Sequence, residues 1–447
     1  MRSAGASCRI LAILALLGGL PAGRGLAQEP ATVPPAPSAA NGGNTGGLSE
    51  FAGPGSAASN PAVTPDFNAE QPAETTAPTP FLLMKALGIP DDSPLRVYGW
   101  IQNSFTANAN GTPRDGDNFA LFPNHLANQW MGNQYYFILE RTMDQAKRFD
   151  YGFRADTLFG NDAQFTHALG LLDTLIRPDR FADLDIPQAY GEFHLALPRT
   201  GGVNVKFGRW YNFAGYETVT AIQRPLLSWA YTMPYFPFTF SGVNVNFRVT
   251  DNIEFWAGAV NGPDRWFDRL GVWNPLAGFR LSSPDNRSAW TTVLTTGPSP
   301  SQVGGRPGTR ASNDKTYLST MFSFQWSDRL SQAVEFDLIA GRDFYSPTAG
   351  RVFPNADYFD FATWLVYRFN DKVSGVSRTE IFRDDQGAAT GVADTFYEST
   401  LGLILKPHDW LWFRPEIRYD WAQFKTPYDN GTQSGRLSIA ADVILLY

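Results

Sequence analysis

A period-two alternation of charged and apolar residues restricts the fold of this 447-residue chain more than any other feature of its sequence. Successive side chains of a β-strand point to opposite faces. In residues 410–421 one row is apolar or aromatic, apart from a proline: Leu411, Phe413, Pro415, Ile417 and Tyr419. The other row holds four charges among its five residues: Trp412, Arg414, Glu416, Arg418 and Asp420. A dry sandwich core would reject such a row, whereas the water-filled lumen of a membrane barrel accepts it. A basic side chain facing lipid would cost about 2–4 kcal/mol.

The alternation continues from Leu95 to the last residue and predicts an all-β fold, a transmembrane antiparallel up-and-down barrel. Sixteen segments of roughly 9–14 residues can be counted, as tilted membrane strands require. They begin near residues 95, 130, 149, 186, 202, 239, 252, 274, 286, 315, 331, 357, 372, 395, 410 and 434. A strand number of 14 or 18 stays open.

The connections between these segments alternate in length. Short turns are expected at 144–147, 198–201, 250–252, 283–285, 327–330, 370–371 and 406–409. Long loops are expected at 109–129, 161–185, 212–238, 262–273, 297–314, 344–356, 384–394 and 425–433. Bacterial barrels have short periplasmic turns and long extracellular loops, so both barrel ends are predicted on the periplasmic side.

The final segment has an aromatic last residue, Tyr447, and an unbroken apolar row: Leu437, Ile439, Ala441, Val443 and Leu445. This pattern resembles the signal read by the outer-membrane barrel assembly machinery. We therefore expect that machinery as a partner, membrane lipid around the barrel, and pairing of the last strand with the strand that begins at Leu95.

The N-terminal residues read as a secretory signal peptide over 1–27. Arg2 and Arg9 precede an apolar stretch that is too short to span a bilayer, and Gly25-Leu26-Ala27 is a small-residue cleavage site. Cleavage would remove the only cysteine, Cys8, and with it any disulfide or thiolate metal site. It would also take the formal net charge from −7 to about −10. With no basic cluster, nucleic acid is not expected as a partner.

Residues 28–80 are dominated by Pro, Ala, Gly, Ser and Thr and predict a disordered periplasmic leader. Residues 81–94 are expected to form a short helix and a linker, and residues 95–447 the barrel. No run of 18 apolar residues follows the signal, so a helical membrane protein is excluded.

The period-two pattern assigns charged side chains of both signs to the lumen. The predicted pore-lining residues are Arg154, Asp156, Glu192, Lys206, Arg248, Glu254, Arg280, Glu335, Asp337, Asp360, Arg368, Arg378, Glu380, Glu398, Arg414, Glu416 and Arg418. Because the two signs are nearly balanced and interspersed, neither a purely anionic nor a purely cationic filter is indicated, and a slight cation preference stays open.

The longest loop, 212–238, carries Glu217 and Arg224. In large porins a long loop commonly folds inward, so we take these two residues as candidates for a constriction that faces the lumen charges. The alternative is an outward loop with solvated charges. Inward aromatic residues could also form a stacking track for sugars or simply fill space: Tyr98, Trp100, Tyr190, Trp210, Trp364 and Trp412.

Several stretches of the chain resemble the OmpL-like β-barrel porin family. They are Tyr98-Gly99-Trp100-Ile101, Tyr151 to Asp156, Gly208-Arg209, Gly215-Tyr216-Glu217, Pro234 and Pro237, Ser241-Gly242-Val243 and Val260-Asn261-Gly262. The resemblance extends over about residues 95 to 447 and implies an outer-membrane porin. It does not carry over a solute.

Other classes of function find little support in the sequence. The four histidines, His125, His167, His194 and His408, come without a nucleophile motif, and the S-x-x-K match at 312–315 falls in a loop. Acidic loop residues could bind calcium, but their spacing is not that of an EF-hand: Asp115, Asp117 and Asn118 in one loop, and Asp179, Asp183 and Asp185 in another. We therefore predict no catalytic residue, no cofactor and no metal site.

The sequence thus predicts an outer-membrane porin that allows passive diffusion of small hydrophilic solutes or ions. The alternative is an adhesin or a structural barrel with a plugged lumen. Porin trimers are common, but no interface can be read from the sequence, so a homo-trimer stays one open possibility.

Overall fold

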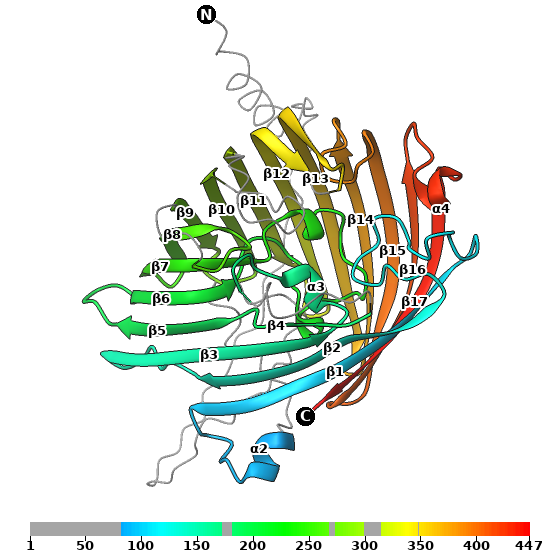
Figure 1. The fold of residues 1–447 in the computed structure, drawn as a ribbon. Coiled ribbons are helices and arrows are strands. Elements are labelled where there is room, and N and C mark those ends of the chain that lie inside the picture. Colours follow the sequence, from blue (N-terminus) through cyan, green and yellow to red (C-terminus); the bar gives the residue numbers. More distant parts are fainter. Residues whose placement is uncertain (1–81, 172–180, 268–272, 299–313, 347) are drawn as a thin grey trace, which may run out of the picture. The chain divides into compact units, whose positions relative to one another are not determined.

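The computed structural model describes residues 82–171, 181–267, 273–298, 314–346 and 348–447. Within them the predicted sixteen-stranded antiparallel barrel is confirmed (Figure 1). Each strand pairs with its sequence neighbours, and the first strand pairs with the last, so the sheet closes on itself. The predicted signal peptide and leader lie outside the described residues.

The first half of the barrel consists of β1 (Leu95–Asn108), β2 (Gln129–Arg141), β3 (Phe149–Gly160), β4 (Asp183–Asp185), β5 (Ala189–Leu195), β6 (Gly202–Tyr211), β7 (Thr239–Thr250), β8 (Ile253–Pro263) and β9 (Asn274–Ser282). The second half consists of β10 (Ser288–Pro298), β11 (Asp314–Gln325), β12 (Leu330–Ser346), β13 (Arg351–Asn370), β14 (Val373–Asp384), β15 (Asp394–His408), β16 (Leu411–Ala422) and β17 (Gly435–Leu446). Short helices are α2 (Leu82–Leu87), α3 (Ala163–Thr166) and α4 (Tyr428–Gly431). None of the described helices is long and apolar enough to cross a membrane.

The strand predicted to begin near residue 186 is interrupted. Both β4 and β5 pair with β3, so they are two pieces of one barrel strand, separated by residues 186–188. Pro187 has no N–H group to donate to the ladder. Gln188 bridges the gap, since its carbonyl accepts a hydrogen bond from the Asp156 N–H (2.9 Å) and its side-chain oxygen accepts one from the Tyr211 N–H (3.2 Å).

The predicted loop at 344–356 is wrong. β12 continues to Ser346 and β13 begins at Arg351, so the two strands form a long hairpin in which Phe344 lies opposite Phe353. Both rings are buried in a cluster with Tyr358 and other aromatic residues. Their packing extends the hairpin beyond the neighbouring strands.

The two faces of the barrel wall differ as the alternation requires. On β16, Phe413, Ile417 and Tyr419 are 39–48% exposed, whereas Arg414 and Arg418 on the other face are at most 2% exposed. Exposed apolar side chains recur on the outer face of the other strands. The outer wall is therefore an apolar surface suited to lipid, and the charges lie inside.

The seam between β1 and β17 depends on a glycine. The Gly99 N–H donates to the Tyr447 carbonyl (3.1 Å), the Tyr447 N–H donates to the Gly99 carbonyl (3.0 Å), and the Tyr447 hydroxyl donates to the Tyr136 carbonyl (2.9 Å). A Cβ on Gly99 would lie 2.7 Å from that hydroxyl and 2.0 Å from the Tyr136 carbonyl oxygen. Only glycine therefore allows the terminal aromatic ring to lie across the closing strand pair.

Candidate functional site

The segment 212–238, which connects β6 to β7, crosses the inside of the barrel (Figure 1). Its base is closed by a hydrogen bond from the Asn212 N–H to the Phe238 carbonyl (2.8 Å). It contains two short 3₁₀ turns, Ala221–Gln223 and Met233–Tyr235. Because it bonds to inward-facing side chains of β2, β12, β14 and β16, we call it the inserted loop.

Three arginines from one side of the barrel donate to main-chain carbonyls of the inserted loop. Arg378 of β14 donates to Ser228 (2.7 Å), and Arg418 of β16 donates to Trp229 (2.7 Å). Arg414 of β16 donates to two carbonyls, those of Ala221 (2.9 Å) and Arg224 (2.6 Å). The guanidinium group suits this task because its rigid fork presents five donors.

Each of these arginines also forms an ion pair with a carboxylate of the barrel wall. Arg378 pairs with Glu398 (2.6 Å), Arg414 with Asp442 (2.5 Å) and Arg418 with Asp420 (2.8 Å). Arg436 of β17 shares Asp420 (2.6 Å) and donates to the Phe119 carbonyl of another loop (2.6 Å). We call the buried set Arg378, Arg414, Arg418 and Arg436 the arginine wall.

Strands β13 to β16 also contact main-chain N–H groups and an apolar side chain of the inserted loop. The Glu416 carboxylate of β16 accepts hydrogen bonds from the N–H groups of Leu227 (2.9 Å) and Ser228 (3.2 Å). Leu226 packs against apolar residues of β13 to β15. Gly402 makes room for it, because a Cβ there would lie 2.5 Å from a Leu226 methyl group.

Four acidic residues on adjacent strands face the inserted loop from the other side, and we call them the carboxylate wall: Glu335 and Asp337 of β12, Asp360 of β13 and Glu380 of β14. Asp337 lies directly opposite Asp360, while Glu335 and Glu380 lie opposite the two sides of Ala362. All four are at most 4% exposed. The register therefore places four carboxylates in one buried patch.

The partners of the carboxylate wall are neutral groups of the inserted loop. The Tyr216 N–H donates to Glu335 (2.6 Å), the Thr232 hydroxyl donates to Asp337 (3.0 Å), and the Thr232 N–H donates to Glu380 (3.3 Å). Within the described residues, none of the four carboxylates forms an ion pair, and neither oxygen of Asp360 accepts a hydrogen bond from a donor group. Asp360 and Glu380 are instead hydrogen-bond partners of each other, as are Glu335 and Asp337. Each of these two carboxylate pairs can therefore hold one proton and one negative charge, and that charge has no ion-pair partner among the described residues.

The constriction candidate Glu217 connects the inserted loop to the arginine wall. Its carboxylate accepts hydrogen bonds from Arg378 (2.6 Å), from the Trp364 indole N–H (3.0 Å) and from the Ala230 N–H (2.7 Å). Both carboxylate oxygens of Glu217 therefore accept hydrogen bonds.

The other candidate, Arg224, is less well paired. It is 1% exposed, donates to the Val219 carbonyl (2.6 Å) and lies 3.6 Å from the Asp162 carboxylate. Two of its guanidinium nitrogens have no hydrogen-bond partner among the described residues. Burial lowers the pKa of Arg224, Asp162 opposes this shift, and the nearby Arg414 adds to it.

The remaining predicted pore-lining charges lie on the same inner face. Arg154 pairs with Asp156 (2.7 Å) and Lys206 with Glu192 (3.6 Å). Glu254 and Glu398 are buried, and the rest are half-buried: Arg248, Arg280 and Arg368. Among the aromatic candidates, Trp100 stacks on Tyr136 with ring centroids 4.2 Å apart.

Several charged residues of the site were missing from the predicted pore residues. Arg436 and Asp442 complete the arginine wall together with Asp420 of the predicted charged row, and Arg209 pairs with Asp185 (2.9 Å) at the base of the inserted loop. Arg436 and Asp442 share one face of the last strand, so the alternation could have identified them but not their ion-pair partners. Arg209 has the opposite parity to the predicted Lys206 on β6, so the alternation could not have identified it.

Asp264, directly after β8, holds the end of the inserted loop. It accepts hydrogen bonds from the N–H groups of Phe238 (3.0 Å) and Thr239 (2.8 Å) and from the Thr239 hydroxyl (3.2 Å). Burial raises the pKa of this carboxyl to about 7, although these hydrogen bonds and Arg209 act in the opposite direction.

The histidines and acidic residues considered for other chemistry fall into small separate groups. His167 pairs with Asp183 (2.6 Å), and His194 bonds to Asn204 (2.7 Å). Asp115 and Asp117 line a cavity of about 910 Å³ among the long loops, whereas Asp179 lies outside the described residues. In the part of the chain that the structure describes, no group of three or more His, Cys, Asp or Glu side chains could hold a metal ion.

A closed antiparallel barrel with an apolar outer face, a charged inner face and a long inserted loop defines a porin-type membrane protein. The chain belongs to the β-barrel porin family whose model is described as "Putative beta-barrel porin-2, OmpL-like", which matches residues 94–446. It is therefore a protein of the outer membrane. The family assignment favours a channel over an enzyme.

Solved structures of outer-membrane proteins share the fold. The outer membrane channel DcaP of Acinetobacter baumannii is 10% identical, with a TM-score of 0.53, over 79% of this chain and 97% of that chain. OprB of Pseudomonas putida is 13% identical, with a TM-score of 0.50, over 79% of this chain and 94% of that chain. No curated protein sequence matches this chain. At these identities the likeness shows the fold alone.

Proposed function

We propose that this protein is a channel for the passive diffusion of small hydrophilic solutes and ions, and that the inserted loop narrows the channel. The observation that carries the proposal is the anchoring of that loop on β2, β12, β14 and β16. A sixteen-stranded barrel is too wide for its own side chains to fill. A solute would pass beside the loop, along the predicted pore-lining residues.

We further propose that the channel prefers cations. The arginine wall is neutralised by Glu398, Asp420 and Asp442, whereas the carboxylate wall forms no ion pair among the described residues. Uncompensated negative charge at a constriction attracts cations and repels anions. This proposal goes beyond the near balance of charges that the sequence predicts.

Reconstitution into planar bilayers, with a panel of salts and uncharged sugars, tests the channel. The proposal expects stepwise conductance and a size limit for the sugars. A barrel of normal stability without conductance would contradict it and would favour the adhesin or the plugged structural barrel. No catalytic residue and no cofactor enters the proposal.

The predicted partners belong to the same proposal. Lipid would contact the apolar outer rows, and the barrel assembly machinery would recognise β17 with its final Tyr447. Chemical cross-linking in native membranes would test for a homo-trimer, which would give a band at three times the monomer mass.

A further inference from the structure

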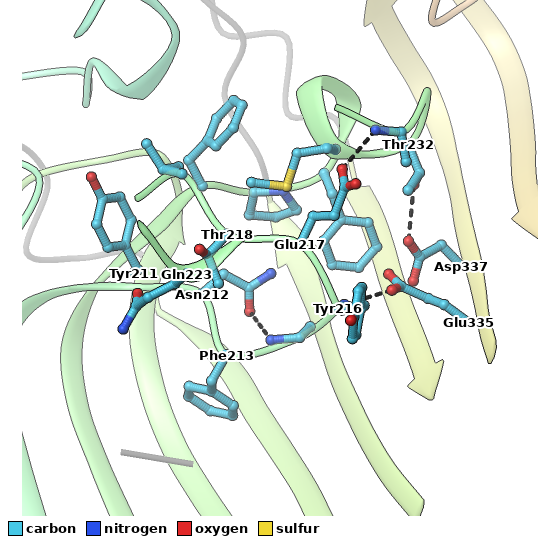
Figure 2. Close-up of a pocket in the computed structure, with 18 of the residues that line it drawn as sticks. Tyr211, Asn212, Phe213, Tyr216, Glu217, Thr218, Gln223, Thr232, Glu335 and Asp337 are labelled. Carbon is cyan, nitrogen blue, oxygen red and sulfur yellow. Dashed lines mark hydrogen bonds between the residues drawn. The ribbon is translucent and has the colours of Figure 1, made fainter. Parts of the chain in front are cut away.

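A cavity of about 80 Å³ lies in the bend of the inserted loop, against β12 (Figure 2). Three carboxylates and three aromatic rings are among the residues that line it: Glu217, Glu335, Asp337, Tyr216, Phe236 and Trp364. A cavity needs only roughly 10–15 Å³ by this measure to hold one water molecule. It therefore has room for a small organic group.

The carboxylates of this cavity are not equivalent. Glu217 is neutralised by Arg378 (2.6 Å). Glu335 and Asp337 have no ion-pair partner among the described residues, and Asp337, 2% exposed, has one carboxylate oxygen that accepts no hydrogen bond from a donor group. The two carboxyl groups lie within hydrogen-bonding distance of each other, so a proton or a cation has to lie beside them. A buried carboxylate oxygen without a donor indicates a missing cationic or hydrogen-bonding group.

Gly215 keeps the Glu335 carboxylate accessible from the loop side. A Cβ at this position would lie 2.8 Å from the Glu335 Oε1 atom, and its φ of +90° is one that other residues rarely adopt. Glu335 has its other oxygen bonded to the Tyr216 N–H (2.6 Å), so that carboxylate is fixed in place beside the cavity.

The surroundings of the two carboxylates suit an ammonium group better than a metal ion. No set of three or more acidic or histidine side chains in the described residues could hold a metal ion. An ammonium group has three N–H donors, which can reach separated oxygen atoms. The rings of Tyr216 and Trp364, with centroids 4.8 Å apart, offer π faces to a cation. Met233, Phe236 and Phe238 supply apolar surface for a short alkyl chain.

We propose that this cavity binds a small primary aliphatic amine, with its ammonium group between Glu335 and Asp337 and its alkyl chain against the aromatic residues of the inserted loop. The inference rests on the proposed channel function, since the amine would be a solute that enters the barrel. It assigns a binding site for primary amines, whereas the proposed cation preference alone assigns no binding site.

Two independent measurements test the site, with n-propylammonium chloride as the probe. In planar bilayers, n-propylammonium should reduce the potassium current through single channels in a saturable manner. In detergent micelles, isothermal titration calorimetry with the purified protein should give saturable binding whether or not the protein conducts. Tetramethylammonium, which has no N–H donor, should bind at least several-fold more weakly.

Variants of the same shape but without the charge test whether Glu335 and Asp337 bind the ammonium group. Asp337→Asn and Glu335→Gln keep an oxygen acceptor for Thr232 and Tyr216 but remove the charge, and each should weaken n-propylammonium binding by about tenfold or more. Asp150→Asn is the matched control, because it removes a buried carboxylate on β3 that does not line this cavity and is not among the predicted pore-lining residues. It should leave the binding constant unchanged.

A further variant acts without touching the carboxylates. Ala230→Leu would fill the cavity from the loop side and should abolish binding. Heat-modifiable migration on gels verifies that each variant barrel is folded.

Three results would overturn the site while leaving the channel intact: no calorimetric binding by the wild type, equal binding of tetramethylammonium, or binding by folded Asp337→Asn and Glu335→Gln variants equal to that of wild type. Binding that is weaker at pH 6 than at pH 8 would support the site, because protons then compete with the ammonium group for the two carboxylates. Loss of conductance with retained calorimetric binding would contradict the channel and not the site.

Discussion

On the arginine wall every guanidinium group meets a carboxylate, whereas on the carboxylate wall, within the described residues, the acidic side chains form no ion pair and bond to neutral groups or to one another. Both walls hold the same loop. A buried ion pair has little net charge, so it fixes the position of the loop but adds little to the electrostatic potential in the channel. A cluster of carboxylates without ion-pair partners makes that potential negative. We therefore infer that the arginine wall fixes the loop, while the carboxylate wall sets the electrostatic potential beside it.

The largest effect is expected when one partner of an arginine-wall pair is removed. Arg414→Met would leave Asp442 buried and uncompensated and would release the Ala221 and Arg224 carbonyls. Breaking a buried pair in this way costs about 3–5 kcal/mol of unfolding free energy. Urea unfolding of the barrel in lipid vesicles measures it.

The matched control is the double variant Arg414→Met with Asp442→Asn, which removes both charges and should recover most of the lost stability. If the single variant were as stable as the double variant, the arginine wall would not depend on charge pairing.

On the carboxylate wall, the combined variant Glu335→Gln, Asp337→Asn, Asp360→Asn and Glu380→Gln should change ion preference more than stability. A charge a few ångströms from a passing ion contributes on the order of 1 kcal/mol in water. Removing this cluster should lower the potassium-to-chloride permeability ratio by about tenfold. The zero-current potential in a KCl gradient measures the ratio, and an unchanged ratio would mean that other charges set the preference.

The two constriction candidates allow a finer comparison. Glu217→Gln breaks a charge-assisted bond to Arg378, and such bonds contribute about 1.5–3 kcal/mol. Arg224→Gln should cost less, because its nearest carboxylate is 3.6 Å away and two of its nitrogens have no partner among the described residues. Single-channel recordings should show more current noise for Glu217→Gln. If both variants conduct and select ions like the wild type, neither residue belongs to a constriction.

The smallest effect is expected at the end of the inserted loop. The pKa of Asp264 is raised to about 7 by burial, so the folded protein favours its neutral form more than the unfolded chain does. Its contribution to stability is full below the ordinary carboxyl pKa and is lost as the pH rises through about 7. Unfolding midpoints between pH 5 and pH 8 should therefore vary less in Asp264→Asn than in the wild type. Equal pH dependence would contradict this role.

Strand positions could be predicted because each depends on local alternation. Segments expected to begin at residues 95, 149, 202, 239 and 274 begin there in the structure. The alternation also has a limit, because the hairpin of β12 and β13 continues through a predicted loop where Phe344 meets Phe353. Packing between paired strands decided that length, and a single-sequence pattern does not contain it.

The path of the inserted loop could not be predicted from the sequence. Its bonds join residues far apart in the chain, such as Ser228 with Arg378 and Tyr216 with Glu335. The sequence indicated a long loop with Glu217 and Arg224 but not which wall each would meet. Knowledge of which residues pair between β12 and β13 would have revealed the carboxylate wall, since Asp337 lies directly opposite Asp360.

A diffusion channel requires the inserted loop to be a constriction and not a plug. The decisive measurement compares single-channel conductance of the wild type with that of a variant in which residues 213–237 are replaced by a short Gly-Ser linker. We expect stepwise conductance from both and a clearly larger conductance from the variant. Equal conductance would show that the loop does not narrow the channel, and a silent wild type beside a conducting variant would show that the loop closes it.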